Sequence, residues 1–170
     1  MLSRIIALLA TATAAVFLTG CAERSYQYRH VPGKTATLRD GYAVAPPSAP
    51  PEVHAAVAAG NRISGSAYSY GAGHGSGFST AYDCSGAASY VLQAAGALDS
   101  PTTSHAFRRF GRSGEGEWIS VWARRGHVFL VVAGLRFDTG WHGRGVARGP
   151  RWTTRSREAR GYVIRHPSGL

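Results

Sequence analysis

The sequence has 170 residues, of which 44% are hydrophobic and 16% charged, with 22 glycines and 8 prolines. This composition suits one globular domain with some irregular chain, and it excludes a collagen-like, coiled-coil or multi-span membrane protein. The formal net charge is +10, and Lys34 is the only lysine among 19 basic residues. Such a charge indicates an anionic setting, such as nucleic acid, a membrane surface or a wall polymer, without choosing between them.

The first twenty residues have the pattern of an export signal. A single charge, Arg4, precedes an apolar stretch that is too weakly hydrophobic to predict a membrane-spanning helix. The stretch ends in Leu-Thr-Gly-Cys at residues 18–21, which resembles the lipobox of bacterial lipoproteins. The resemblance implies that Cys21 is lipidated and anchors the protein in the cell envelope. Because Ala22 is not aspartate, it also implies the outer membrane, facing the periplasm, in a host with two membranes; a plain signal peptide is the alternative.

The chain has two cysteines, Cys21 and Cys84, too few for a disulfide framework or a four-cysteine metal site. If Cys21 carries a lipid, Cys84 has no partner in the mature chain. An unpaired thiol is a liability in an oxidising compartment, so its presence there makes Cys84 a candidate nucleophile. The alternative is a buried cysteine that acts as a small apolar side chain.

Proline clusters divide the exported chain into a tether and a domain. Residues 21–51 comprise Cys21, whose lipidation the lipobox resemblance implies, and a polar segment that ends in a proline-rich run. This segment is predicted to be a stiff polyproline II tether without a fold of its own. Residues 52–170 are then one domain. Its first helix is predicted over residues 52–61, and a second over 84–97, with Asp83 as N-cap and Gly96 at its end.

After residue 115 the apolar pattern changes to a period of two, which predicts strands over 118–123, 127–133, 135–139 and 161–165. Helices followed by an antiparallel meander give the α+β fold class. If a two-residue turn near Gly134 joins the second and third strands, paired residue numbers sum to 267 or 269, and Asp138 shares a sheet face with His127. A three-residue turn would place Asp138 on the other face. Residues 141–160 are predicted to form a long surface loop.

The start of the second helix carries the strongest chemical signal. The unpaired N–H groups and the dipole of a helix N-terminus favour negative charge, and therefore the reactive thiolate of Cys84. A thiolate nucleophile requires a positioned imidazole, which in turn requires an orienting acceptor. His127 and Asp138 are the predicted base and acceptor.

Other histidines compete for a role. His74 and His142 lie next to glycines and are candidates to line a cleft, whereas His54 and His166 are expected to be solvated. The sequence lacks the motifs G-x-S-x-G, H-E-x-x-H and C-x-x-C as well as a P-loop. A zinc hydrolase built from scattered His and Asp residues therefore has no spacing in its favour.

Three segments together resemble the NlpC-type cysteine peptidases of bacterial cell walls, a papain-like family. They are Tyr-Ser-Tyr-Gly at 68–71, Tyr-Asp-Cys-Ser-Gly at 82–86 opening a helix, and Gly-His-Val at 126–128 opening a strand. The match covers about residues 55–140. The resemblance implies a papain-like NlpC-type fold, with N-terminal helices packed on an antiparallel sheet. It also implies a hydrolase of peptidoglycan stem peptides, commonly cutting between γ-D-glutamate and a diamino acid.

The resemblance also implies roles for individual residues. By position, Cys84 is the nucleophile, His127 the general base and Asp138 the residue that orients His127. The positions implied to hold the substrate peptide are Tyr68, Asp83 and Ser85, to which the cleft candidates His74 and His142 are added. The segment before Cys84 is longer than usual, residues 118–123 replace the usual Gly-Asp-Leu strand, and Asp138 stands where histidine is frequent. The third catalytic position is therefore open between Asp138 and His142.

The expected partners are peptidoglycan stem peptides and, through the lipid anchor, a membrane. No metal or organic cofactor is expected, because thiol acyl transfer needs none. No nucleic acid is expected, because the chain is exported and has no recognised RNA- or DNA-binding motif. We expect a monomer. The alternative function is a non-catalytic envelope lipoprotein that binds wall peptides or a partner protein through the same cleft.

Overall fold

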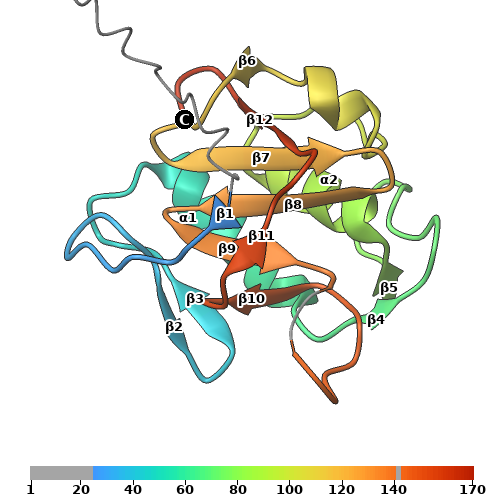
Figure 1. Cartoon of the computed structure of the whole chain (residues 1–170), viewed down its shortest axis with the longest axis horizontal. Helices are drawn as coiled ribbons and strands as arrows, with labels where there is room; N and C mark the ends of the chain where they lie inside the picture. The colour runs from blue at the N-terminus through green and yellow to red at the C-terminus, as the bar shows by residue number, and fades with distance from the viewer. Residues whose placement is uncertain (1–24, 141–142) are drawn as a thin grey trace, which may run out of the picture.

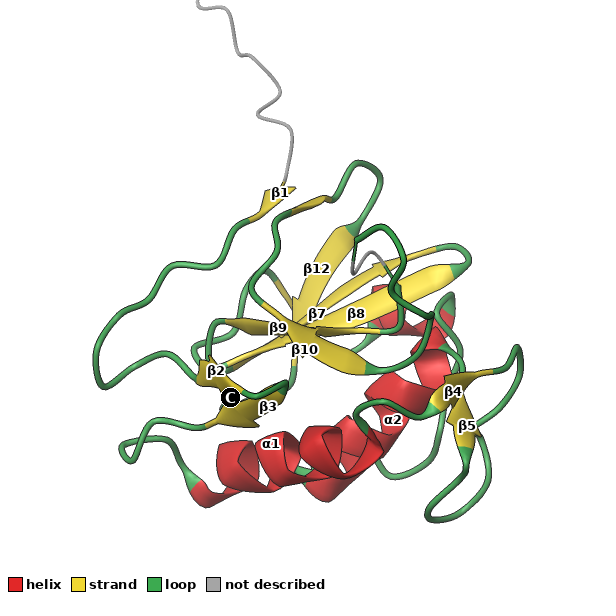
Figure 2. Cartoon of the chain, turned by 90° about the horizontal axis from the view of Figure 1, so that it is seen from below, coloured by secondary structure: helices red, strands yellow, loops and turns green. Residues whose placement is uncertain are grey.

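Two helices cover one face of an antiparallel sheet in this structure, a computed structural model that describes residues 25–140 and 143–170. The helices are α1 (Pro51–Ile63) and α2 (Cys84–Ala94), which pack against each other and against the sheet (Figures 1 and 2). The chain is therefore α+β, as predicted. Within the described ranges, no helix combines the length and the apolar character that crossing a bilayer would require.

The main sheet has six strands in the order β10-β9-β8-β7-β12-β6, and all neighbours are antiparallel. The strands are β6 (Arg112–Ser113), β7 (Ile119–Arg124), β8 (His127–Val132), β9 (Leu135–Asp138), β10 (Arg151–Thr153) and β12 (Val163–His166). A 3₁₀ turn, η1 (Ala106–Arg109), links α2 to the sheet. The four predicted strands are present as β7, β8, β9 and β12, but β12 lies beside β7 rather than following β9, and the sheet has two further strands, β6 and β10.

A two-residue turn joins β8 to β9, as one of the predicted alternatives required. Val132 pairs with Leu135 across the turn, so the residue numbers of each pair sum to 267. The turn residues Ala133 and Gly134 have φ values of +45° and +76°. Two positive φ angles are what a type I′ hairpin needs, because that turn matches the twist of the strands. This register places Asp138 on the same sheet face as His127.

The two faces of the sheet have different coverings. Val128 and Leu130 of β8 point to the helices and belong to the main core, together with the apolar stripes of α1 and α2. Phe129 points the other way and packs with Trp122 and Tyr162 in a second, smaller cluster. Alternation along the strand therefore puts Phe129 and Val131 of β8 on the face away from the helices.

The prediction that residues 21–51 have no fold is wrong for much of this segment. Strand β1 (Ser25–Tyr26) pairs with β11 (Arg157–Glu158) over the face opposite the helices (Figure 2). Strands β2 (Thr37–Arg39) and β3 (Tyr42–Val44) form a hairpin against α1. The side chain of Asn61 exchanges two 2.9 Å hydrogen bonds with the backbone of Ala43. These partners are distant in sequence, so local polarity could not reveal them. Cys21 lies outside the described residues.

Three further boundaries differ from prediction. Residues 151–153 form a strand rather than part of a loop, and its Trp152 packs on Phe137 with ring centroids 4.7 Å apart. Residues 157–158 form a second short strand, which pairs with β1. Helix α1 approaches Trp152 closely at Gly60, where a Cβ would lie 2.4 Å from the indole ring. Helix α1 continues to the buried Ile63, and α2 ends at residue 94, before Gly96 with φ +65°.

Tyr26 offers a test of whether the N-terminal segment belongs to the domain. Its hydroxyl donates to Gly134 O at 2.9 Å and accepts from Arg136 N–H at 3.1 Å. Tyr26→Phe leaves both buried backbone groups without this partner, so we expect the free energy of unfolding to fall by about 1–3 kcal/mol in urea titrations. The matched change Tyr42→Phe, at a tyrosine that is 53% exposed, should have little effect. Equal stability of the two variants would contradict the assignment.

Candidate active site

Cys84 is the first residue of α2, and Asp83 caps that helix as predicted. Oδ1 of Asp83 accepts a hydrogen bond from Gly86 N–H at 2.7 Å. The first helical hydrogen bond runs from Ala87 N–H to Asp83 O, so the N–H groups of Cys84 and Ser85 precede it. Cys84 is only 8% exposed. The sulfur is thus placed at a helix start that favours negative charge.

A glycine-containing loop crosses the start of α2 and explains why Gly86 is small. A Cβ on Gly86 would lie 2.2 Å from Ala72 O. The same carbonyl accepts the Asp83 N–H at 3.0 Å, and Gly71 N–H donates to Asp83 Oδ2 at 3.0 Å. The loop is therefore fixed to the helix start through Asp83.

Asp83 also brings together His74 and Ser85, two of the predicted substrate-binding residues. Its Oδ1 lies 3.1 Å from His74 Nε2 and accepts the Ser85 hydroxyl at 3.0 Å. Burial opposes ionisation of Asp83, but the hydrogen bonds from Gly86, His74 and Ser85 outweigh it and lower the pKa of the carboxyl. The ionised carboxylate therefore organises its neighbours beside Cys84.

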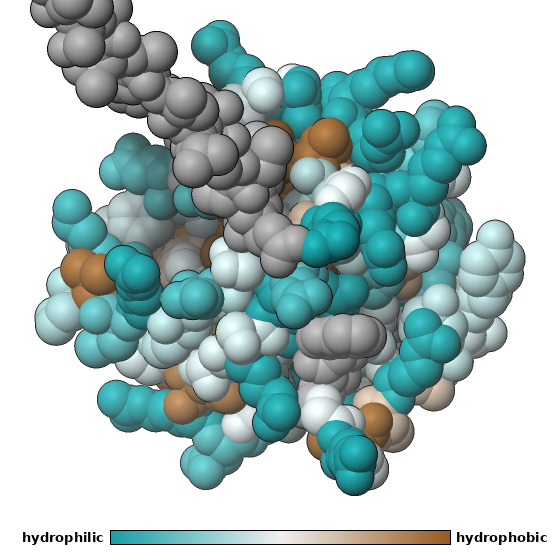
Figure 3. Space-filling view, viewed as in Figure 1, coloured by the Kyte–Doolittle hydropathy of each residue, from teal (hydrophilic) through white to brown (hydrophobic). Residues whose placement is uncertain are grey.

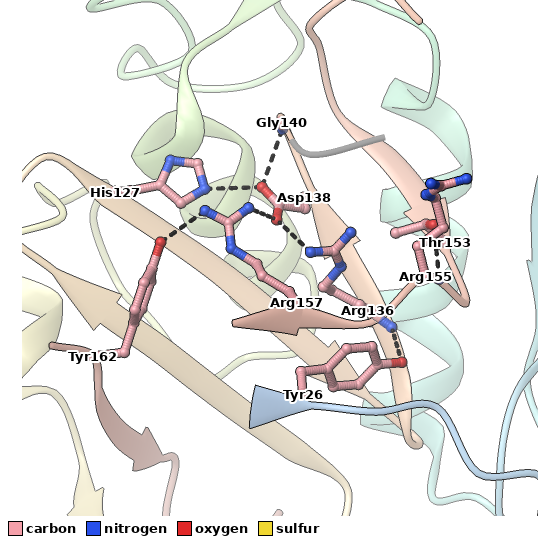
Figure 4. A network of polar contacts seen from close by, with 9 residues as sticks. All are labelled: Tyr26, His127, Arg136, Asp138, Gly140, Thr153, Arg155, Arg157 and Tyr162. Carbon is pink, nitrogen blue, oxygen red and sulfur yellow. Dashed lines mark hydrogen bonds and ion pairs between the residues drawn. The ribbon is translucent and has the colours of Figure 1, made fainter. Parts of the chain in front are cut away.

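The predicted base and acceptor meet on the sheet. His127 begins β8, and its Nε2 lies 2.9 Å from Oδ1 of Asp138 at the end of β9 (Figure 4). The pairing of Leu130 with Phe137 puts Asp138 diagonally across from His127, as the predicted register required. The other ring nitrogen, Nδ1, points away from Asp138 in Figure 4. Nδ1 is therefore the nitrogen that can accept a proton from a thiol.

Cys84 interacts with this imidazole. Burial opposes protonation of His127, but hydrogen bonding and charge from Asp138 and Cys84 outweigh burial and raise its pKa. Helix α2 also contacts both β8 and β9. The sulfur of the helix and the imidazole of the sheet thus form one interacting pair, with Asp138 on the far side of the ring.

Asp138 binds two arginines in addition to His127 (Figure 4). Oδ2 lies 3.3 Å from Arg136 Nη1 and 2.5 Å from Arg157 Nη1, and Oδ1 accepts the Gly140 N–H at 3.1 Å. Burial alone would raise the pKa of Asp138, but His127 and the two arginines lower it. The carboxylate is therefore ionised and held at both oxygens.

Sequence reasoning missed Arg136 and Arg157. Arg157 also donates from Nη2 to the Tyr162 hydroxyl at 2.8 Å, and the Tyr162 ring meets the edge of His127 at a centroid distance of 6.4 Å. Arg136 is fully buried in β9. One signal was available for it: two residues before Asp138, an arginine interrupts an apolar strand on the same face. No local signal marked Arg157.

Tyr68 borders the sulfur from another side. Strand β4 (Ala67–Tyr68) pairs in parallel with β5 (Ala81–Tyr82), which places Tyr68 next to Tyr82, two residues before Cys84. Burial and then the charge of Cys84 raise the pKa of Tyr68. The guanidinium of Arg148 lies 4.4 Å from the centre of the Tyr68 ring.

The remaining predicted residues are placed as follows. His142 lies outside the described residues. His54 is exposed on α1, and His166 is partly exposed near the Gly114 carbonyl. In the described ranges, no group of three or more His, Cys, Asp or Glu side chains is arranged to hold a metal ion. The structure brings together the predicted residues Tyr68, His74, Asp83, Cys84, Ser85, His127 and Asp138.

Comparison of the sequence with protein-family models and with curated proteins gave no match. Function is therefore inferred from the geometry around Cys84 and from the short motifs that carry it.

The electrostatic link between Asp138 and His127 can be measured directly. Asp138→Asn removes the negative charge that favours the imidazolium, so the pKa of His127 should fall. Titration of the His127 ring by NMR gives the value, and Asp99→Asn, at an exposed carboxylate, is the matched control. An unchanged His127 pKa in Asp138→Asn would mean that the two groups are not coupled in solution.

Proposed function

We propose that the protein is a cysteine peptidase of the NlpC type that hydrolyses peptidoglycan stem peptides at the cell envelope. The observation that carries this proposal is the chain of contacts from Cys84 through His127 to Asp138. A thiol, an imidazole and an orienting carboxylate in series are the parts that thiol acyl transfer requires. The α+β architecture, with helices on one face of an antiparallel sheet, is compatible with a papain-like NlpC-type fold.

The first half of the reaction would run from this arrangement. His127 Nδ1 takes the thiol proton, and the Cys84 thiolate attacks the amide carbonyl carbon, forming a C–S bond. The resulting imidazolium, which Asp138 stabilises, gives its proton to the amide nitrogen as the C–N bond breaks. The products of this half are a thioester on Cys84 and a free amine.

The second half releases the acyl group. His127, now neutral, removes a proton from a water molecule that attacks the thioester carbonyl. The C–S bond breaks and the thiolate leaves, recovering its proton from the imidazolium. In both halves the negative oxygen would bind near the Cys84 N–H at the start of α2, and one such donor is worth about 3 kcal/mol in the transition state.

The substrate class and location come from the sequence resemblance. Stem peptides cut between γ-D-glutamate and a diamino acid are the implied substrate, and Tyr68, Asp83 and Ser85 are the implied peptide-holding positions. Their clustering around Cys84 supports this assignment. The lipobox at residues 18–21 supports a lipid anchor on Cys21, and the organised domain begins a few residues later, which would hold the site near the membrane surface.

The central test is release of stem-peptide fragments from purified sacculi by the full-length chain in detergent. We expect the wild type to release fragments and Cys84→Ala to release none, because no other group in the described site can form the thioester. Ser89→Ala, at a buried hydroxyl of the same helix, is the matched control and should stay active. Sacculus binding by wild type and Cys84→Ala alike, without release, would instead establish a non-catalytic binding protein.

The third catalytic position has its own test. Asp138→Asn should lower kcat by at least about a hundredfold with little change in KM, since the residue orients the base rather than the substrate. His142→Ala should leave kcat close to that of the wild type. The opposite pattern, with Asp138→Asn active and His142→Ala inactive, would assign the role to His142.

A further inference from the structure

A pocket of about 780 Å³ opens beside His127. It lies between the β7–β8 turn, the chain after β9 and the loop joining β10 to β11. Its lining residues are Arg124, Gly126, His127, Gly140, Gly143, Arg144, Val146, Arg148, Arg155, Ser156 and Arg157. We call this the arginine pocket.

The arginine pocket carries excess positive charge. Arg124, Arg144, Arg148 and Arg155 have exposed side chains, and none forms an ion pair with an acidic side chain of the described residues. The carboxylate of Asp138, which contacts the lining residues His127 and Arg157, is buried and also paired with Arg136. The pocket therefore lacks an internal counter-charge.

This concentration of charge does not follow from local composition. Arg124 ends β7, Arg144 and Arg148 follow β9, and Arg155 follows β10, so the fold brings separate segments to one rim. Positive charges held close together repel one another and destabilise the folded state, and an anion bound between them relieves this repulsion. The face of the molecule in Figure 3 is mostly hydrophilic, with apolar residues in small separate patches.

The position of the pocket indicates which fragment of the substrate would lie in it. In the proposed reaction the His127 imidazolium gives its proton to the departing amine, so that fragment leaves on the side of His127. The arginine pocket is lined by His127 itself, whereas Asp83, His74 and Ser85 gather at the start of α2. The amine fragment and the pocket therefore share one side of the site.

We propose that the arginine pocket binds an oxyanion, a carboxylate or a phosphate, carried by the leaving fragment of the substrate. The assignment of the anion to the leaving fragment, rather than to the acyl fragment, rests on the proposed peptidase function. Guanidinium groups suit such a ligand, because their planar N–H pairs match two oxygens of one oxyanion.

The test measures equilibrium binding without turnover. Full-length Cys84→Ala protein is titrated with two otherwise identical stem peptides, one ending in a carboxylate and one in a carboxamide. We expect the carboxylate peptide to bind at least about tenfold more tightly, because one charge-assisted hydrogen bond typically changes affinity by at least this factor. The preference should fall severalfold in Arg144→Gln and Arg155→Gln. Arg125→Gln is the matched control, because Arg125 adjoins Arg124 in sequence without lining the pocket.

Inorganic phosphate distinguishes the two sources of the anion. If phosphate binds in an Arg144- and Arg155-dependent way while the two peptides bind equally, the site takes a phosphate-bearing group instead of a peptide carboxylate. Equal peptide affinities together with no arginine-dependent phosphate binding would overturn the proposal. Arginine-dependent binding without fragment release by the wild type would refute the peptidase function and leave the anion site standing, so the two failures are distinguishable.

Discussion

The carboxylate of Asp138 is the group on which the arrangement of this site depends. It orients His127 from β8, and it binds Arg136 of β9 and Arg157 of β11. Removing one of these partners would strongly destabilise the protein, because a buried charge would then lack its opposite charge. Arg157 in turn reaches Tyr162, so a single buried charge connects the imidazole to the C-terminal strands.

A second carboxylate organises the other half of the site in a similar way. Asp83 caps α2 and fixes the crossing loop and His74, so the surroundings of Cys84 are set by one side chain. Helix and sheet then need only pack correctly for Cys84 to meet His127. Each carboxylate has its pKa lowered by its donors, and both are therefore charged over the pH range in which a thiol–imidazole pair would work.

The high arginine content has two distinct structural uses. Arg136 and Arg157 are buried and neutralise Asp138, whereas Arg124, Arg144, Arg148 and Arg155 surround an open pocket. Buried arginines suit the first use because a planar guanidinium can satisfy a carboxylate and a second acceptor together. Arg136 and Arg157 thus share one buried carboxylate, whereas the four pocket arginines have no acidic partner among the described residues and can attract an anionic ligand.

The sequence by itself determined the features that depend on neighbouring residues: the helix that starts at Cys84 with its Asp83 cap, and the strands on either side of the Gly134 turn. It left two turn lengths open, and the two-residue turn in the structure decided that His127 and Asp138 share a sheet face. Capping, periodicity and turn length act over a few residues, so their signals are local. Only the tertiary structure decided the rest. Tyr26 meets Arg136 across 110 positions of sequence, and Arg157 meets Asp138 across 19. The contact of Cys84 with His127 and the arginine pocket likewise require separate segments to pack together, which no local pattern encodes.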